Sequence, residues 1–293
     1  MSSLVDQITR QVNDMPKVSE APYRLLRAMS DENYSTDDII QIVESDLTLT
    51  TQCLKIVNSA AFGLRNQISS IKQAVILLGG STIVEIALSQ TFSSIFSSPL
   101  TGYVAEKEEF WAHSNRCALG AKILARKFTP NINPDMAYTA GLLHDLGKVI
   151  ISDFLEKFRD DLLEQFKIET HIGFLQMEEK FLGTNHTIVG EKIARKWQFP
   201  ESLISAIRYH HEVQQAPEQF KFLVAIIHLA DILAMISGNG TGIDSLAYEL
   251  DPTALKLLKI ENENQVDHII MDIDMEYLAI KERLNQSMNA AKG

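Results

Sequence analysis

The chain has 293 residues, of which 45% are hydrophobic, and its 27 Lys and Arg against 38 Asp and Glu give a net charge of −11. This length and composition predict one large or two modest folded domains and exclude a disordered chain. The acidic charge argues against nucleic-acid binding. Two cysteines without Cys-x-x-Cys spacing exclude a disulfide framework and a cysteine-based zinc site.

Two features bear on where the protein acts. The first residues, MSSLVDQITRQ, lack the charged-then-apolar layout of a signal peptide. The most apolar stretch, 222–236, is shorter than a membrane span and carries His228 and Asp231. We therefore expect a cytoplasmic protein that makes no contact with a membrane.

Along the chain the apolar positions recur at intervals of three and four, and no long alternating stretch is present, which predicts an all-α fold. Residues 35–38 have the composition of a helix cap and precede an apolar helix. Ser45 and Asp46 begin a second helix, and a third is expected over 71–78, ending at two glycines.

A turn-rich segment, 97–102, separates this part from the next. It predicts an amino-terminal helical subdomain over 1–100, a second helical subdomain over 101–243 and a helical tail over 244–293. The helices expected in the second subdomain cover 110–128, 135–144, 185–197, 201–211 and 222–236. The tail carries an amphipathic pattern at Ile269, Ile273, Tyr277 and Ile280, typical of a helical appendage or partner surface.

Histidine and aspartate residues fall on the apolar faces of these predicted helices. His113 lies on the apolar stripe of its helix, and Asp231 is a carboxylate in an almost wholly apolar helix, where an unpaired charge costs several kcal/mol. The candidate metal ligands are His113, His144, Asp145, His186, His210, His211 and Asp231. Neutral imidazole and carboxylate suit Fe, Mn, Zn or Ni, so one or two divalent ions are expected.

Each of these residues also has a simpler interpretation. A single inward histidine is more often a hydrogen-bonded core residue than a ligand, and we interpret His171, His228 and His268 in that way. Asp231 alone could join two helices through a hydrogen bond, and Lys148 could complement a helix dipole. A shared metal site is favoured because the simpler interpretations would all have to hold together.

The motif GLLHDLGK at 141–148, with His113 before it and Asp231 after it, resembles the signature of the HD phosphohydrolase superfamily. His186 and the pair His210 and His211 are similar to the second-metal histidines of its HD-GYP branch. The segments SDLTLTTQCLKIVNSAAFGL (45–64) and ISSIKQAVILLGG (68–80) resemble the amino-terminal module of the HDOD family. The resemblance covers roughly 16–240.

The HDOD resemblance implies an all-α protein in which an amino-terminal helical subdomain packs on an HD-like helical bundle, followed here by the helical tail. It also implies a regulatory output module of bacterial signalling without established enzymatic activity. Where HDOD proteins usually have Asp-Pro, this chain has Asp46 and Leu47. The segment VQQAPEQF after Glu212 lacks the Asp-Gly and Gly-Tyr-Pro residues of cyclic-di-GMP phosphodiesterases, which argues against that activity.

Two functional hypotheses follow. The favoured one is a non-catalytic signalling module with a metal or nucleotide-phosphate site, a signalling protein as partner, a nucleotide as candidate ligand and self-association as candidate assembly. The alternative is a metal-dependent phosphohydrolase acting on a nucleotide or cyclic nucleotide, with Asp145 and Lys148 as catalytic residues. In it, one metal would be held by His113, His144, Asp145 and Asp231, and a second by Asp145, His186, His210 and His211.

Overall fold

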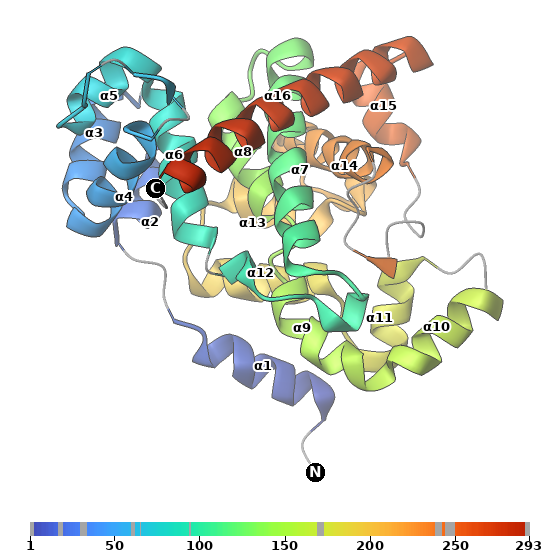
Figure 1. The fold of residues 1–293 in the computed structure, drawn as a ribbon. Helices are drawn as coiled ribbons and strands as arrows, with labels where there is room; N and C mark the ends of the chain where they lie inside the picture. The colour runs from blue at the N-terminus through green and yellow to red at the C-terminus, as the bar shows by residue number, and fades with distance from the viewer. Residues whose placement is uncertain are drawn as a thin grey trace.

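The computed structural model describes residues 3–16, 20–29, 34–59, 62–64, 66–93, 95–168, 173–237, 242–243 and 250–290 (Figure 1). Within these ranges every regular element is a helix, apart from an isolated antiparallel bridge between Leu100 and Ala105. The all-α prediction is confirmed.

The first helices are short and begin where the sequence places its caps. They are α1 (Leu4–Asp14), α2 (Glu20–Ala28), α3 (Thr36–Glu44), α4 (Leu47–Val57), α5 (Ile71–Leu78) and α6 (Gly80–Ser93). The Ser35 hydroxyl caps α3 by accepting a hydrogen bond from the backbone N–H of Asp38. The Asp38 carboxylate in turn accepts one from the backbone N–H of Ser35. Asp46 caps α4 in the same way through the backbone of Leu49. The caps predicted from local sequence are therefore present.

α1 lies apart from α2–α6 and packs against helices of the second half of the chain (Figure 1). Lys196 holds its last turn, because its ammonium donates to the carbonyl of Val12 over 2.9 Å. Trp197 holds the chain just after the helix, because its indole donates to the carbonyl of Pro16 over 3.0 Å. The division at residue 100 remains a prediction, and α1 packs against α9 (Lys148–Leu155) and α12 (His186–Lys196).

The second half contains η2 (Ile95–Ser97), η3 (Thr101–Tyr103), α7 (Lys107–Phe128), α8 (Pro134–Leu143), α9 (Lys148–Leu155), η4 (Glu156–Phe158), α10 (Arg159–Ile168), α11 (Phe174–Leu182), α12 (His186–Lys196), α13 (Glu201–Tyr209), η5 (Val213–Gln215), η6 (Glu218–Phe220) and α14 (Lys221–Ile236). α7 packs on α8 and α14 to form the centre of the bundle. α14 is buried along almost its whole length, because nearly all its side chains are apolar.

A polar network joins α6 to this bundle. Asp135, near the start of α8, accepts hydrogen bonds from the hydroxyls of Ser81 and Tyr34, the latter over 3.0 Å. Lys122 of α7 pairs with Glu85 of α6 and lies 3.6 Å from Asp135. Lys122 and Asp135 are buried, and unpaired charges would be costly there. Their pairing therefore stabilises the contact between α6 and the bundle.

The tail forms α15 (Pro252–Leu258) and α16 (Glu263–Ala290), and α16 crosses α7 (Figure 1). Ile269 and Ile273 are buried on the inner face of α16, as the amphipathic pattern predicts. The Ile280 side chain lies outside the described residues. Arg116 of α7 pairs with Asp274, and its guanidinium carbon lies 4.0 Å from the ring centroid of Tyr277. The tail is thus fixed to α7 by both apolar and charged contacts.

One stretch of the described chain, Glu218–Ile236, is long and apolar enough to cross a membrane by length and composition, so the predicted shortness of this segment is wrong. The reason is that η6 continues into α14 and lengthens the helix. However, 67% of its most apolar window is buried against other helices, as in the core helix of a folded domain. The bent pair α5 and α6 reaches the same criterion only if it is counted as one broken span.

Candidate metal centre

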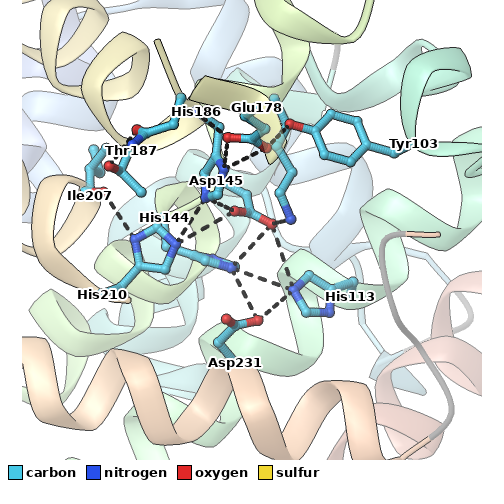
Figure 2. A network of polar contacts seen from close by, with 12 residues as sticks. Tyr103, His113, His144, Asp145, Glu178, His186, Thr187, Ile207, His210 and Asp231 are labelled. Carbon is cyan, nitrogen blue, oxygen red and sulfur yellow. Dashed lines mark hydrogen bonds and ion pairs between the residues drawn. The ribbon is translucent and has the colours of Figure 1, made fainter. Parts of the chain in front are cut away.

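The predicted ligand residues converge on one buried cluster, although they come from five segments of the chain (Figure 2). α7 supplies His113, and the turn after α8 supplies His144 and Asp145. α12 begins with His186, the end of α13 supplies His210 and His211, and the middle of α14 supplies Asp231. The structure therefore brings all seven residues together.

The first group surrounds one side of Asp145. His113 Nε2 lies 3.1 Å from Asp231 Oδ1 and 3.4 Å from His144 Nε2. His144 Nε2 lies 3.5 Å from Asp231 Oδ1, and Asp145 Oδ2 is 3.4 Å from His144 Nε2 and 3.9 Å from His113 Nε2. His113, His144 and Asp145 form one group with a spacing that could hold a metal ion, and Asp231 forms another such group with His144 and His210.

The second group surrounds the other oxygen of the same carboxylate. Asp145 Oδ1 lies 3.4 Å from His186 Nε2 and 3.7 Å from His210 Nε2, and these two nitrogens are 3.4 Å apart. The ring centroid of His211 is 4.1 Å from that of His210 and 5.2 Å from that of His186. One donor atom from each of the four side chains lies within 4.8 Å of every other, a spacing that could hold a metal ion.

Asp145 is therefore the link between the two groups. Its Oδ2 faces His113 and His144, and its Oδ1 faces His186 and His210. A carboxylate that turns one oxygen to each group has the arrangement needed to bridge two metal ions.

Backbone carbonyls fix the orientation of two of the imidazoles. His144 Nδ1 is 2.8 Å from the carbonyl of Gly141, and His210 Nδ1 is 2.9 Å from the carbonyl of Ile207. A carbonyl only accepts, so Nδ1 carries the proton in both rings. Each ring therefore turns its Nε2, the atom that would ligate a metal, into the cluster.

Glu178 of α11 performs the same task for His186, and the sequence reasoning missed it. It is completely buried, and His186 Nδ1 lies 2.9 Å from each of its oxygens, while the backbone N–H of His186 donates to Oε2 over 2.7 Å. Tyr103 also donates to this carboxylate (Figure 2). The signal was present, because Glu178 is four residues from both Phe174 and Leu182 and so lies on an apolar stripe.

Lys148 is turned into the protein rather than towards solvent. It is 2% exposed, and its ammonium lies 2.7 Å from Asp145 Oδ2 and 5.3 Å from the ring centroid of Tyr103. Burial alone would raise the pKa of Asp145, but His144 and Lys148 lower it well below its ordinary value. Asp145 is therefore held as a carboxylate.

The pKa values of Asp231, His144 and His210 are shifted in different directions. Burial alone would raise the pKa of Asp231, but hydrogen bonds from His113 and His144 lower it well below its ordinary value. Burial would lower the pKa of His144, but the carboxylate of Asp145 raises it well above its ordinary value. Burial lowers the pKa of His210 to about 4, so this ring is neutral at pH 7.

Glycines allow the segments that carry the ligands to approach closely. A Cβ on Gly141 would lie 2.8 Å from the backbone of Cys117 and Ala118 on α7. A Cβ on Gly147 would lie 1.9 Å from the carbonyl oxygen of His186. At Gly141, α8 thus lies directly against α7. At Gly147, the turn that carries His144 and Asp145 (the HD turn, 144–147) lies directly against α12, because glycine has no side chain.

The donor set fits a divalent metal. It contains only imidazole nitrogens and carboxylate oxygens, which Fe, Mn, Zn and Ni accept, and it includes no thiolate. Buried carboxylates and oriented Nε2 lone pairs are what such an ion needs for binding. The three remaining histidines lie elsewhere: His228 is a buried, hydrogen-bonded core residue, His268 is exposed on α16, and His171 lies outside the described residues.

Comparisons with known proteins agree with this fold. A crystal structure of an HDOD domain protein of unknown function from Geobacter sulfurreducens has a TM-score of 0.70 and 26% identity, over 97% of this chain and 96% of that one. A Shewanella amazonensis protein, provisionally named a phosphohydrolase, has a TM-score of 0.65 and 19% identity over 95% of this chain and 97% of that one. At that identity the likeness shows the fold alone.

The sequence was also compared with known proteins. A Treponema pallidum protein of uncharacterised function is 25% identical over 265 residues, which are 90% of this chain and 50% of that protein. This chain therefore spans about half the length of that relative. The sequence profile of the HDOD domain matches residues 15–213, which include every candidate ligand except Asp231. Because this match covers most of its length, the chain belongs to the HDOD family.

Proposed function

We propose that the chain is a signal-transduction module whose HD-type site binds one or two divalent metal ions and which acts through a protein partner rather than by catalysis. The burial of the site carries this proposal. The side chains of His113, His144, Asp145, His186, His210 and Asp231 are between 0% and 4% exposed.

A hydrolytic metal centre needs a coordination position that a substrate can reach and a cleft that takes the phosphoester. Here the one partly exposed member of the ligand set is His211. Lys148, which would offset phosphate charge in an enzyme, pairs with Asp145 inside the fold. These features support a site that holds metal or responds to it, and they do not favour turnover.

The partner proposed is another signalling protein in the cytoplasm. A nucleotide remains a candidate ligand of the same site, and self-association a candidate assembly. The metal is Fe, Mn, Zn or Ni, because imidazole and carboxylate ligands select weakly among these ions.

The test is element-resolved metal analysis of the purified chain, repeated with Asp145→Ala. We expect one or two equivalents of metal in the wild type and their loss in the variant, with partner capture retained. A folded Asp145→Ala protein that has lost all cellular output would contradict a purely non-catalytic module. A wild-type protein that binds no divalent ion would overturn the metal site.

One observation favours the alternative of a metal-dependent phosphohydrolase. The two donor groups share Asp145, which is the arrangement of two-metal phosphoesterases. When bound, two ions would supply an activated water and a positively charged clamp for a phosphoryl group. His113, His144 and Asp231 would hold one ion, and His186, His210 and His211 the other, with Asp145 between them.

The alternative has its own test. Protein loaded with Mn²⁺ or Fe²⁺ is assayed against nucleotides, cyclic nucleotides and an aryl phosphodiester, beside Asp145→Asn. Activity that disappears in Asp145→Asn would establish the enzyme. Full metal occupancy with no turnover on this panel would exclude it for these substrates.

A further inference from the structure

One imidazole connects the carboxy-terminal tail to the metal-ligand cluster by hydrogen bonds. His228 of α14 is 1% exposed, and both of its ring nitrogens are engaged. Its Nδ1 lies 2.7 Å from the carbonyl oxygen of His210, and its Nε2 lies 2.8 Å from the backbone nitrogen of Asp251. The ring therefore bridges a candidate ligand and the first residue of the tail helices.

The direction of both hydrogen bonds is fixed. The backbone N–H of Asp251 can only donate, so Nε2 of His228 accepts and Nδ1 carries the proton. The Nδ1–H group donates a hydrogen bond to the carbonyl oxygen of His210, which can only accept. The neutral Nδ1–H form of His228 is thus the form that satisfies both neighbours at once.

The carbonyl of His210 belongs to the peptide that joins two candidate ligands. It lies at the end of α13, where the last carbonyls of a helix have no partner within the helix. The same planar peptide unit joins His210 to His211, and both are candidate ligands. A hydrogen bond to this carbonyl therefore fixes the peptide from which both imidazoles project.

The other end of the bridge is anchored by the tail. Asp251 caps α15, where its carboxylate accepts from the backbone N–H of Thr253 over 2.7 Å. Ala254 and Leu258 of α15 are buried, and α15 packs on α14. α16 then binds α7 through Ile273, which would touch a Cβ on Gly120, and through the pairing of Asp274 with Arg116.

We propose that His228 is a positioning residue that transmits the docking of the carboxy-terminal tail to the half of the metal site formed by Asp145, His186, His210 and His211. A partner that lifts the tail would then weaken the ion at this half and leave the ion at the His113, His144 and Asp231 half in place. This proposal rests on the proposed function, because it assigns a regulatory input to the same metal site.

A pair of variants at Asp251 isolates the connecting hydrogen bond. Asp251→Ala removes the helix cap but keeps the backbone N–H, whereas Asp251→Pro removes both. The φ of −71° at this position suits proline, but the proline Cδ takes the place of the N–H and would also displace His228 Nε2, which lies 2.8 Å from this nitrogen. A second comparison uses His228→Phe, which retains the ring volume, with the exposed His268→Phe as its control.

The measurement is Co²⁺ binding to the full chain by calorimetry and visible absorption, with the two steps assigned by His113→Ala and His186→Ala. We expect Asp251→Pro to bind the ion of the His186 half about 10–100-fold more weakly than Asp251→Ala, and the other ion within about twofold. His228→Phe should show the same selective loss, and His268→Phe none. Far-UV circular dichroism of each metal-free variant checks its folding.

The outcomes distinguish the role of His228 from the existence of the metal site. If the wild type binds two ions and both Asp251 variants bind them equally, the role of His228 is wrong and the metal site stands. Equal weakening of both ions would also overturn it, because a general loss of stability does not distinguish the two halves. If the wild type binds no Co²⁺, the metal site fails and this inference falls with it.

Discussion

Lys148 places its ammonium 2.7 Å from Oδ2 of Asp145, and the two side chains are 2% and 1% exposed. Asp145, which faces both halves of the site, is thus partly neutralised by a cation from its own turn. A divalent ion would compete with this ammonium for the same oxygen. The pair consequently governs the charge of the cluster before any metal binds.

Lys148→Met keeps the length of the side chain and removes its charge. Removing one partner of a buried ion pair costs about 3–5 kcal/mol, so the metal-free protein should be less stable by that order. The affinity for Mn²⁺ should rise, because the cluster becomes more negative. Urea unfolding with and without Mn²⁺ measures both effects, with the exposed Lys157→Met as control. An unchanged metal-free stability together with weaker Mn²⁺ binding would contradict this role.

Asp145→Asn tests whether one carboxylate serves both halves of the site. We expect both ions to bind at least about 100-fold more weakly, more than the loss typical of an outer hydrogen-bond partner. Asp153→Asn, an exposed carboxylate of the following helix, is the matched control and should bind as the wild type does. Loss of one ion with retention of the other would show that Asp145 does not bridge. Calorimetric stoichiometry distinguishes the cases.

The sequence predicts those parts of the fold that depend on neighbouring residues. Ser35 and Asp46 are caps because a side-chain oxygen can reach the backbone N–H groups of the next turn, and this is visible in a few residues. The packing of α1 against α12 depends on contacts between distant residues, such as Lys196 with Val12, which are 184 residues apart. No local pattern contains that information.

The same distinction applies to the candidate site. The inward orientation of His113 and Asp231 follows from the apolar stripes of their own helices, and the structure places both in the cluster. The inward turn of Lys148 could not be predicted, because it depends on how the HD turn meets η3 and α12. Glu178 could have been found by the stripe argument used for His113, since it lies on the apolar face of its helix between Phe174 and Leu182.

Glu178→Gln tests the support of His186. The amide retains the size of the carboxylate but removes the negative charge that strengthens the imidazole as a ligand. We expect the ion of the His186 half to bind about 10–100-fold more weakly. The neighbouring Glu179 is exposed and bonds Asn185 over 2.7 Å, so Glu179→Gln is the matched control. Equal Co²⁺ affinities in the two variants would show that Glu178 does not act on the metal site.

The charge of His144 makes metal binding depend on pH. Burial would lower its pKa, but Asp145 raises it well above its ordinary value, so the metal-free ring is protonated at pH 7. A ligand imidazole must be neutral, and binding therefore releases this proton. The pKa of His210 is about 4, and the pKa values of Asp145 and Asp231 lie well below their ordinary value, so these groups release none near pH 7.

Between pH 6 and 7.5 the affinity for Mn²⁺ should rise with pH, by up to about tenfold per unit for one released proton, and it should level off once the pH exceeds the raised pKa of His144. Calorimetry at pH 7 in two buffers with different ionisation enthalpies counts the protons, and we expect about one. In His144→Ala the remaining affinity should depend less on pH. A pH-independent affinity with no proton release would show that His144 is neutral before the ion arrives.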